Sequence, residues 1–391
     1  MGRFENTGAY LSAMARRAVF SPYQPKTILN KAKRPDHWFW TRYSAYPYLG
    51  CQHGCEFCYC REQKYAPHDD PLDFAYVIKV KENAPRLLRQ ALSRAPVDVI
   101  GLGDYQPAER KFGLTRQMLE VCAELGFPVL ILSRSPLVLR DLDLLQTLRD
   151  RAAVTVAFSL ISAPGSPAYA RVCEMEHLAP PAAKRLAAME QLAKAGIPVG
   201  ISCMPILPGL CDTDANLEAV VRQVAAHGGR FVLASGLTLA DQQRAFFFNV
   251  LRGRFADLLP LYNRLYPPGS YGPVGWPWPP LARRLKALCQ LHGLADRMPR
   301  PILAGDKRAL NKRIVEKLAQ QIYDLEIAEA APQRVWALRK AAWAIEDLPQ
   351  DIGLVHQQMG RRGIESLPGV GPRLAPEITR LMELLRPVNR L

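Results

Sequence analysis

Residues 50–60 read GCQHGCEFCYC and hold four of the nine cysteines of the chain. Cys51, Cys55 and Cys58 have the spacing C-x3-C-x2-C. Three thiolates on one short loop can hold three corners of a cubane iron–sulfur cluster, which leaves the fourth iron open for a substrate or cofactor. Zinc usually takes four protein ligands, so Cys60 as a fourth ligand keeps a zinc site as the alternative. Because these cysteines crowd together, we expect a metal site in a reducing cytoplasm rather than a disulfide framework.

Short apolar runs alternate with helical segments on either side of this loop and beyond it. We expect strands at residues 42–48, 97–102, 128–132, 154–160, 197–204 and 230–234. We expect the intervening helices at residues 112–125, 137–149, 180–195 and 214–226. Near-continuous apolar strands that alternate with helices indicate parallel pairing with right-handed crossovers. The pattern predicts an α/β fold with a partial (β/α)6 barrel, and a doubly wound sheet is the main alternative. The cysteine loop follows the first strand, at the end of the barrel where active sites gather.

The remaining sequence divides into further segments. We expect a basic aromatic arm over residues 1–40, the barrel over 41–235, an extension with a Pro- and Trp-rich loop over 236–300, and a small all-α domain over 301–391. Helices are expected in the last two segments near residues 241–258, 281–291, 312–328, 333–345, 351–359 and 373–385. A length of 391 residues suits two or three domains.

Composition excludes several classes of protein. Only 22% of the residues are charged and 49% are hydrophobic, so global disorder is not expected. No stretch reaches about 18 uninterrupted apolar residues, so we expect no membrane span. The net charge of +15 favours a polyanionic partner. Residues 1–40 hold seven basic and two acidic residues beside aromatic ones, which suits nucleic acid. The simpler interpretation is an arm that docks its aromatic side chains on the main domain.

Several motifs in order along the chain resemble one enzyme family. The cysteine loop, with Phe57 before its third cysteine, resembles the signature of radical S-adenosylmethionine (SAM) enzymes. The motifs GDYQPAE at 103–109, LSRS at 132–135, EHLAP at 176–180, AGIP at 195–198 and PILPG at 205–209 are similar to those of the spore photoproduct lyase-like group, often labelled DNA repair photolyases. The resemblance covers roughly residues 40–300.

The resemblance implies a set of cofactor contacts. Cys51, Cys55 and Cys58 would bind a [4Fe-4S] cluster whose fourth iron is chelated by SAM. One electron would then cleave SAM to methionine and a 5′-deoxyadenosyl radical, which abstracts a hydrogen atom from the substrate. The residues that would contact SAM are Phe57 near the adenine, Gly103 and Asp104 near the methionine amino group, Arg134 at its carboxylate and Ser159 at the ribose or carboxylate.

Each contact also has an ordinary structural alternative. Phe57 is explained equally well as core, Arg134 and Ser135 as caps of the next helix, and Ser159 as a polar strand end. One departure matters for the reaction. Spore photoproduct lyases have a hydrogen-donating cysteine at the end of the second strand, whereas residues 97–109 contain no cysteine. We therefore do not expect the chain to reverse the spore thymine photoproduct in that way.

The C-terminal stretch IESLPGVGPRLA at 364–375 resembles a helix-hairpin-helix motif. Gly369 and Gly371 allow a tight turn that brings backbone N–H groups, including that of Val370, close to a phosphate, and Arg373 adds a cation. The alternative is a Gly-rich turn in a helical bundle. Residues 307–385 resemble the N-terminal domain of X-family DNA polymerases. This resemblance implies that Lys340 is a further contact to nucleic acid.

These polymerases can use a lysine of this domain as a lyase nucleophile. The aligned position here is Asp347, and an acid cannot form a Schiff base. The resemblance therefore implies a nucleic-acid-binding module without lyase chemistry.

Together the two modules predict a radical SAM enzyme that repairs or modifies a nucleotide in DNA. The expected cofactors are the [4Fe-4S] cluster and SAM, and the expected partners are DNA and an electron donor such as flavodoxin or ferredoxin. One alternative is radical SAM modification of RNA or of a protein side chain. The other is an iron–sulfur protein that binds nucleic acid or senses redox state without catalysis.

Overall fold

Six parallel strands in chain order form the centre of the molecule. The computed structural model describes residues 16–66 and 68–385. The main sheet has the order β10-β9-β8-β7-β6-β3-β2, and all its neighbours are parallel except β2 and β3. Its strands are β2 (Asn30–Lys31), β3 (Tyr43–Ser44), β6 (Ile100–Leu102), β7 (Val129–Ser133), β8 (Val154–Ser159), β9 (Val199–Ile206) and β10 (Val232–Gly236). An unreversed order with helical crossovers confirms the partial (β/α)6 barrel over the doubly wound sheet, whose strand order reverses at a switch point.

The crossover helices cover one face of these strands. Their apolar side chains form a single buried core with those of the strands, which are almost wholly buried in β8. The helices that follow β6 to β9 are α4 (Glu109–Phe112), α5 (Leu114–Leu125), α6 (Leu142–Arg151), α7 (Tyr169–Met175), α8 (Ala182–Lys194) and α9 (Asp214–Ala226). The short 3-10 helix η2 (Pro136–Asp141) precedes α6. The core therefore fixes the strand ends, and with them the residues that follow each strand.

The first expected strand is shorter than the predicted 42–48, because the chain changes sheets within it. After β3, residues Tyr48–Leu49 form β4 and pair antiparallel with β5 (Val77–Val80), which pairs on its other side with β1 (Val19–Pro22). Pro47 lies at the crossing and has no N–H to continue a ladder. The segment between the sheets contains η1 (Tyr59–Arg61), α2 (Asp73–Tyr76) and α3 (Ala84–Leu92).

The extension closes over the last strand. It contains α10 (Asp241–Arg254), α11 (Leu259–Leu265) and α12 (Trp278–Leu291). The Pro- and Trp-rich loop is ordered by its aromatic side chains: Trp276 donates from Nε1 to Oδ2 of Asp212 at 3.0 Å and packs on Trp278. Gly236 lies directly under the Trp276 ring, where a Cβ would come within 2.7 Å of Cζ3.

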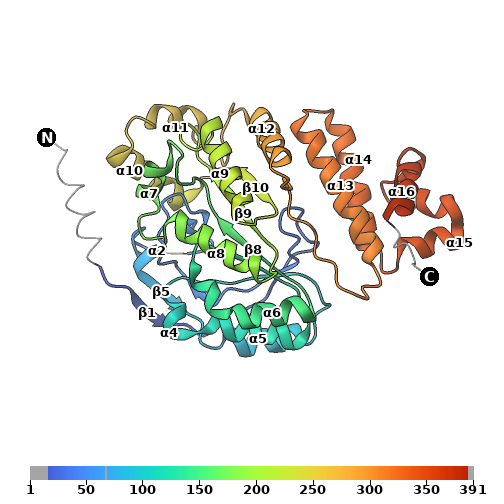
Figure 1. Ribbon diagram of the computed structural model, residues 1–391, viewed down its shortest axis with the longest axis horizontal. Coiled ribbons are helices and arrows are strands. Elements are labelled where there is room, and N and C mark those ends of the chain that lie inside the picture. Colours follow the sequence, from blue (N-terminus) through green and yellow to red (C-terminus); the bar gives the residue numbers. More distant parts are fainter. Residues whose placement is uncertain (1–15, 67, 386–391) are drawn as a thin grey trace.

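Four helices form the C-terminal segment at one end of the molecule (Figure 1). They are α13 (Ala309–Ile327), α14 (Pro332–Asp347), α15 (Ile352–Glu365) and α16 (Gly371–Leu385). Helix α15 bends at Gly360 and continues to Glu365, beyond the end expected near residue 359. Their core continues onto the barrel through Met298 and includes Leu130 of β7 and Leu233 of β10. The helical segment is therefore packed on the barrel and not merely tethered to it.

The N-terminal arm lies between these two parts. Trp40 is 3% exposed and donates from Nε1 to the carbonyl of Met298 at 2.9 Å. Arg34 donates from Nε to both carboxylate oxygens of Asp347 at 2.9 Å and lies over the ring of Trp343. The docking interpretation of the arm thus holds for its described part, and residues 1–15 lie outside that part. None of the helices in the described ranges has the length and apolar character needed to cross a bilayer.

Candidate radical SAM site

The cysteine loop lies between β4 and η1, against the ends of the barrel strands. Gln106, which follows β6, fastens its start: Nε2 donates to the carbonyl of Gly50 at 3.1 Å, and Oε1 accepts from the amide of Gln52 at 3.0 Å. Arg61 fastens its middle by donating to the carbonyls of Gly54 at 2.8 Å and Cys55 at 3.0 Å. These contacts hold the start and the middle of the loop. Spacing arguments missed both anchors, although Gln106 lies inside the GDYQPAE motif.

The thiols of this loop are free, and those of Cys58 and Cys60 lie within hydrogen-bond distance of each other. None of the nine cysteines forms a disulfide. Burial raises the pKa of Cys51 well above its usual value and that of Cys55 to about 12, while a hydrogen bond from Cys60 lowers the pKa of Cys58. Buried thiols of this kind become thiolates when a metal takes the charge.

The donor set of this loop is compatible with an iron–sulfur cluster. In residues 16–66 and 68–385, no three His, Cys, Asp or Glu side chains converge on one metal position. A cubane takes each thiolate at a different iron, so its ligands need not converge. Nδ1 of His53 and Oε1 of Gln52 are buried without a partner in the described structure, which suits a group bound inside the loop. The residues present therefore fit a [4Fe-4S] cluster.

Arg134 and Phe57 lie together beside this loop. The Cζ atom of Arg134 is 5.3 Å from the centroid of the Phe57 ring, and Phe57 is 1% exposed. Nη1 of Arg134 donates to Oε1 of Glu176, and Nη2 of Arg185 donates to Oε2 of the same carboxylate. The pKa of Glu176 is lowered, because its two arginine partners outweigh the opposing effect of burial. Arg134 is thus a fixed cation next to the predicted cluster.

The same network extends to Ser159 at the end of β8. Nη1 of Arg185 donates to the carbonyl of Ser159 at 2.8 Å. Glu176 and Arg185 are therefore the link between two predicted site residues, and sequence reasoning missed both as site residues. The available signal was the EHLAP motif, which begins with Glu176. The alternative of a helix cap is correct for Ser135, whose Oγ accepts from the amide of Leu137 at 3.2 Å, but Arg134 takes no part in that cap.

Gly103 and Asp104 follow β6 and precede Gln106, which is bound to the start of the loop. Gly103 has φ +103°, and a Cβ there would lie 2.8 Å from Cγ2 of Ile131, so both conformation and space favour glycine. Asp104 accepts from Nε2 of Gln106 at 3.0 Å. Burial raises the pKa of Asp104 to about 6, even though Gln106 opposes the shift. Asp104 is thus joined to the start of the loop through Gln106, Arg134 lies over Phe57, and Ser159 is joined to Arg134 through Arg185 and Glu176.

The residues predicted to contact nucleic acid lie together in the helical segment. The hairpin between α15 and α16 packs on α14, where a Cβ on Gly369 would be 2.6 Å from Cβ of Lys340. Val370 is 4% exposed and so anchors the hairpin, whereas Lys340 and Arg373 are exposed. Gly371 begins α16 with φ +59°. The predicted residues are therefore neighbours, with Val370 as a packing residue.

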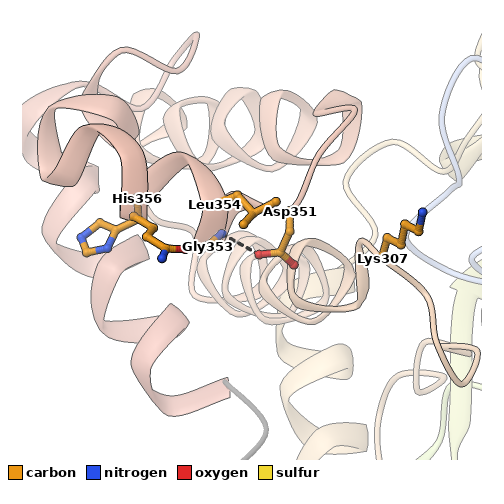
Figure 2. A pocket seen from close by; sticks show the side chains of 6 residues that line it. Lys307, Asp351, Gly353, Leu354 and His356 are labelled. Carbon is orange, nitrogen blue, oxygen red and sulfur yellow. Dashed lines mark hydrogen bonds between the residues drawn. The ribbon is translucent and has the colours of Figure 1, made fainter.

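A separate hollow of about 720 Å³ lies beside the start of α15. Figure 2 shows Asp351 at the start of α15, where its Oδ1 accepts from the amide of Gly353 at 2.7 Å. Lys307, Leu354 and His356 also line the hollow. The Asp351 carboxylate already caps α15, and none of the residues that line the hollow comes from the barrel. We assign it no part in the chemistry of the cysteine loop.

Comparison with known proteins places this geometry in a family. Residues 46–224 match the family model described as the radical SAM superfamily. An uncharacterized protein of Mycobacterium tuberculosis (strain H37Rv) is 31% identical over 268 residues, which cover 66% of this chain and 77% of the relative. An uncharacterized protein of Methanocaldococcus jannaschii is 29% identical over 197 residues, covering 48% of this chain and 68% of the relative.

Solved structures show the same fold. A spore photoproduct lyase mutant superposes with a TM-score of 0.52 at 14% identity, covering 71% of this chain and 82% of that one. A second mutant of that enzyme, with bound AdoMet and dinucleoside spore photoproduct, gives a TM-score of 0.51 at 14% identity with the same coverage. The cysteine loop, the parallel barrel and these matches agree. The chain belongs to the radical SAM superfamily, whose enzymes use a [4Fe-4S] cluster and S-adenosylmethionine.

Proposed function

We propose that this radical SAM enzyme acts on a nucleotide in DNA, for repair or modification. The observation that carries the proposal is the presence, in one packed chain, of the cysteine loop with Arg134 beside it and of a glycine hairpin seated on Lys340. Backbone N–H groups of such a hairpin bind phosphates without reading sequence. The likeness to spore photoproduct lyase supports DNA as the substrate class.

In this proposal Cys51, Cys55 and Cys58 hold the cluster. When bound, the cluster supplies the electron that cleaves SAM and so generates the radical that abstracts hydrogen from the nucleotide. Arg134, held by Glu176 and Arg185, presents its charge to the SAM carboxylate. The four other contact residues, Phe57, Gly103, Asp104 and Ser159, shape the rest of the SAM site.

The helical segment holds the DNA in this proposal. Gly369, Val370 and Gly371 shape the hairpin that meets the phosphates, and Arg373 and Lys340 add cations. The target nucleotide leaves its stack to enter the barrel. Because no cysteine forms a disulfide, we place the enzyme in the reducing cytoplasm, where flavodoxin or ferredoxin serves as its electron donor.

The reaction differs from that of spore photoproduct lyase in its hydrogen donor. Residues 97–109, which contain β6 and the turn after it, hold no cysteine. Cys203 of β9 does not replace it, since its side chain is 0% exposed in the core shared with the helices. We therefore propose a lesion or base other than the spore photoproduct.

The test is substrate-stimulated cleavage of SAM. Anaerobically reconstituted protein with dithionite and SAM should release 5′-deoxyadenosine, and ultraviolet-damaged DNA should raise the rate. Cys55→Ala should abolish release. RNA and a protein extract are the comparison arms: stimulation by either of them but not by DNA would overturn the DNA assignment.

A further inference from the structure

One face of α14 leaves aromatic and basic side chains open to solvent. Trp336 is 47% exposed, and the Cζ atom of Arg339 lies 4.9 Å from its ring centroid. Trp343 follows two turns later and contacts Trp336 edge-on at 6.2 Å between ring centroids. A half-exposed indole beside a cation is a surface that gains from a flat, anionic partner.

The N-terminal arm forms the opposite wall. Arg34 lies over Trp343, with its Cζ atom 5.2 Å from the centroid of that ring. Arm residues Asp36 and Trp38, together with α13 and α14, line a cleft of about 250 Å³ that continues from Trp343. The cleft and the α14 face thus form one surface, which we name the arm groove: Arg34, Trp38, Arg297, Trp336, Arg339 and Trp343.

Arg297 lies at the floor of the arm groove between two rings. Its Cζ atom is 4.1 Å from the centroid of Trp38 and 3.3 Å from that of Tyr323. Its buried Nε has no partner, and no ion pair in residues 16–66 and 68–385 includes it. Burial lowers the pKa of Arg297. A guanidinium held this way has donors to offer to an anion.

Two of the carboxylates near Arg297 are already committed to other donors. Asp36 accepts from the amides of Trp38 and Phe39 and from the amide and hydroxyl of Thr41. Glu326 forms an ion pair with Arg339. Asp296, the preceding residue, has a buried Oδ2 without a partner and partly balances the charge of Arg297, so what the groove offers an anion is the unpartnered Nε–H donor of Arg297.

Rings that alternate with guanidinium groups fit unpaired nucleotides. Each base offers a flat face to a ring, and each phosphate accepts hydrogen bonds from a guanidinium. A duplex keeps its bases stacked inside, so its bases do not reach such rings. Arg339 of the groove is followed by Lys340, which packs against hairpin residue Gly369. A strand bound at the hairpin can therefore continue along α14.

We propose that the arm groove binds an unpaired DNA strand, with bases on Trp336 and Trp343 and a phosphate on Arg297. The proposal rests on the DNA partner assigned above but adds a second binding surface, distinct from the hairpin. In this proposal the N-terminal arm and the helical segment bind the same DNA strand.

The test measures binding of a fluorescein-labelled oligothymidine to the full-length reconstituted protein by anisotropy. Trp336→Ala should weaken single-strand binding about tenfold, as expected for the loss of one stacked base, and Trp336→Phe should restore most of it. Arg297→Gln should also weaken it, with thermal melting as a check on folding. Leu291→Ala on α12, which removes an equally open apolar side chain (77% exposed), is the matched control and should bind as the parent does.

Two outcomes overturn the proposal: unchanged oligothymidine affinity in Trp336→Ala, or equal loss in Leu291→Ala. Failure of the proposed function looks different. If the parent protein binds oligothymidine through Trp336 but DNA never stimulates SAM cleavage, the groove stands and the DNA reaction is wrong. If DNA stimulates cleavage while Trp336→Ala binds normally, the reaction stands and the groove is wrong.

Discussion

Arg134 and Glu176 form a buried ion pair beside the cysteine loop, with side chains 14% and 4% exposed. The pair joins the end of β7 to the end of α7, two segments 42 residues apart. Arg185, 3% exposed, supplies the second cation of this Arg–Glu–Arg triad. The pair fixes where the Arg134 charge lies, over the ring of Phe57. Glu176 thereby becomes a structural determinant of the predicted SAM site.

Glu176→Gln should destabilise the fold strongly. It leaves two buried guanidinium groups without their counter-charge, and breaking a buried pair typically costs about 3–5 kcal/mol. Urea unfolding of the protein should show a loss of this size. The exposed pair of Glu190 and Lys194 offers the control, since Glu190→Gln should cost less than about 1 kcal/mol. Equal effects of the two substitutions would contradict the role given to Glu176.

Arg134→Gln should weaken SAM binding and leave the cluster in place. A lost hydrogen bond to a charged group costs about 1.5–3 kcal/mol, so we expect a drop in affinity of at least tenfold. The measurement is the SAM-induced shift of the EPR signal of the reduced cluster, titrated with SAM. Iron content equal to that of the parent shows that the cluster remains. Unchanged SAM affinity would remove Arg134 from the site.

Substitution of single cysteines should separate cluster ligands from other thiols. Cys51→Ala, Cys55→Ala and Cys58→Ala should each lose most of the iron and the cluster absorption after anaerobic reconstitution. Cys122→Ala is the control, because Cys122 is buried like Cys55 but lies on the core face of α5. Cys60→Ala distinguishes the two metal hypotheses: a cluster with three ligands keeps its iron, whereas a site with four protein ligands does not.

Much of the barrel is predictable from sequence because its strands are nearly continuous apolar runs. The strands expected at residues 154–160 and 197–204 correspond closely to β8 and β9. The small sheet was not predicted, since β1 pairs with β5 across almost sixty residues and both strands are four residues long. Such pairing depends on the folded chain and has no local signal.

The candidate site was also predictable from the sequence only in part. The cysteine spacing is contiguous in sequence and therefore visible. The contacts that orient Arg134 involve Glu176 and Arg185, which lie on other segments and come near only when β7 and β8 pair. Charge alone did not mark these residues, because most arginine and glutamate side chains serve at the surface. Burial, which only the structure supplies, marks them as part of the site.

Acid should weaken the attachment of the helical segment to the barrel. Arg300 donates to both oxygens of Glu346 at 2.6 and 2.8 Å and lies over Trp40. Burial alone would raise the pKa of Glu346, but the Arg300 hydrogen bonds outweigh it and the pKa is lowered from 4.5. A lowered carboxyl pKa contributes stability above about pH 4.5 that is lost as the pH falls through the folded value.

Tryptophan fluorescence followed from pH 7 to pH 3 should therefore show a transition that begins below about pH 4.5. Glu346→Gln should be less stable at pH 7 and should lose this part of the pH dependence. Glu329→Gln is a suitable control, because Glu329 is an exposed carboxylate at the end of α13. A transition of the same size in both variants would show that Glu346 is not the responsible group.

Two glycines of the hairpin should respond differently to alanine. Gly369 has φ +77° and its Cβ would collide with Cβ of Lys340, whereas Gly371 has φ +59° with open space around it. Gly371→Ala carries only the cost of the left-handed backbone, roughly 1 kcal/mol, while Gly369→Ala must also push the hairpin away from α14. Duplex DNA affinity should therefore fall much more in Gly369→Ala, measured by anisotropy beside a melting curve.

Arg373→Gln should instead reduce the salt dependence of binding by about one charge without changing the melting temperature. Equal DNA affinity in all three variants would mean that the hairpin does not contact the phosphates.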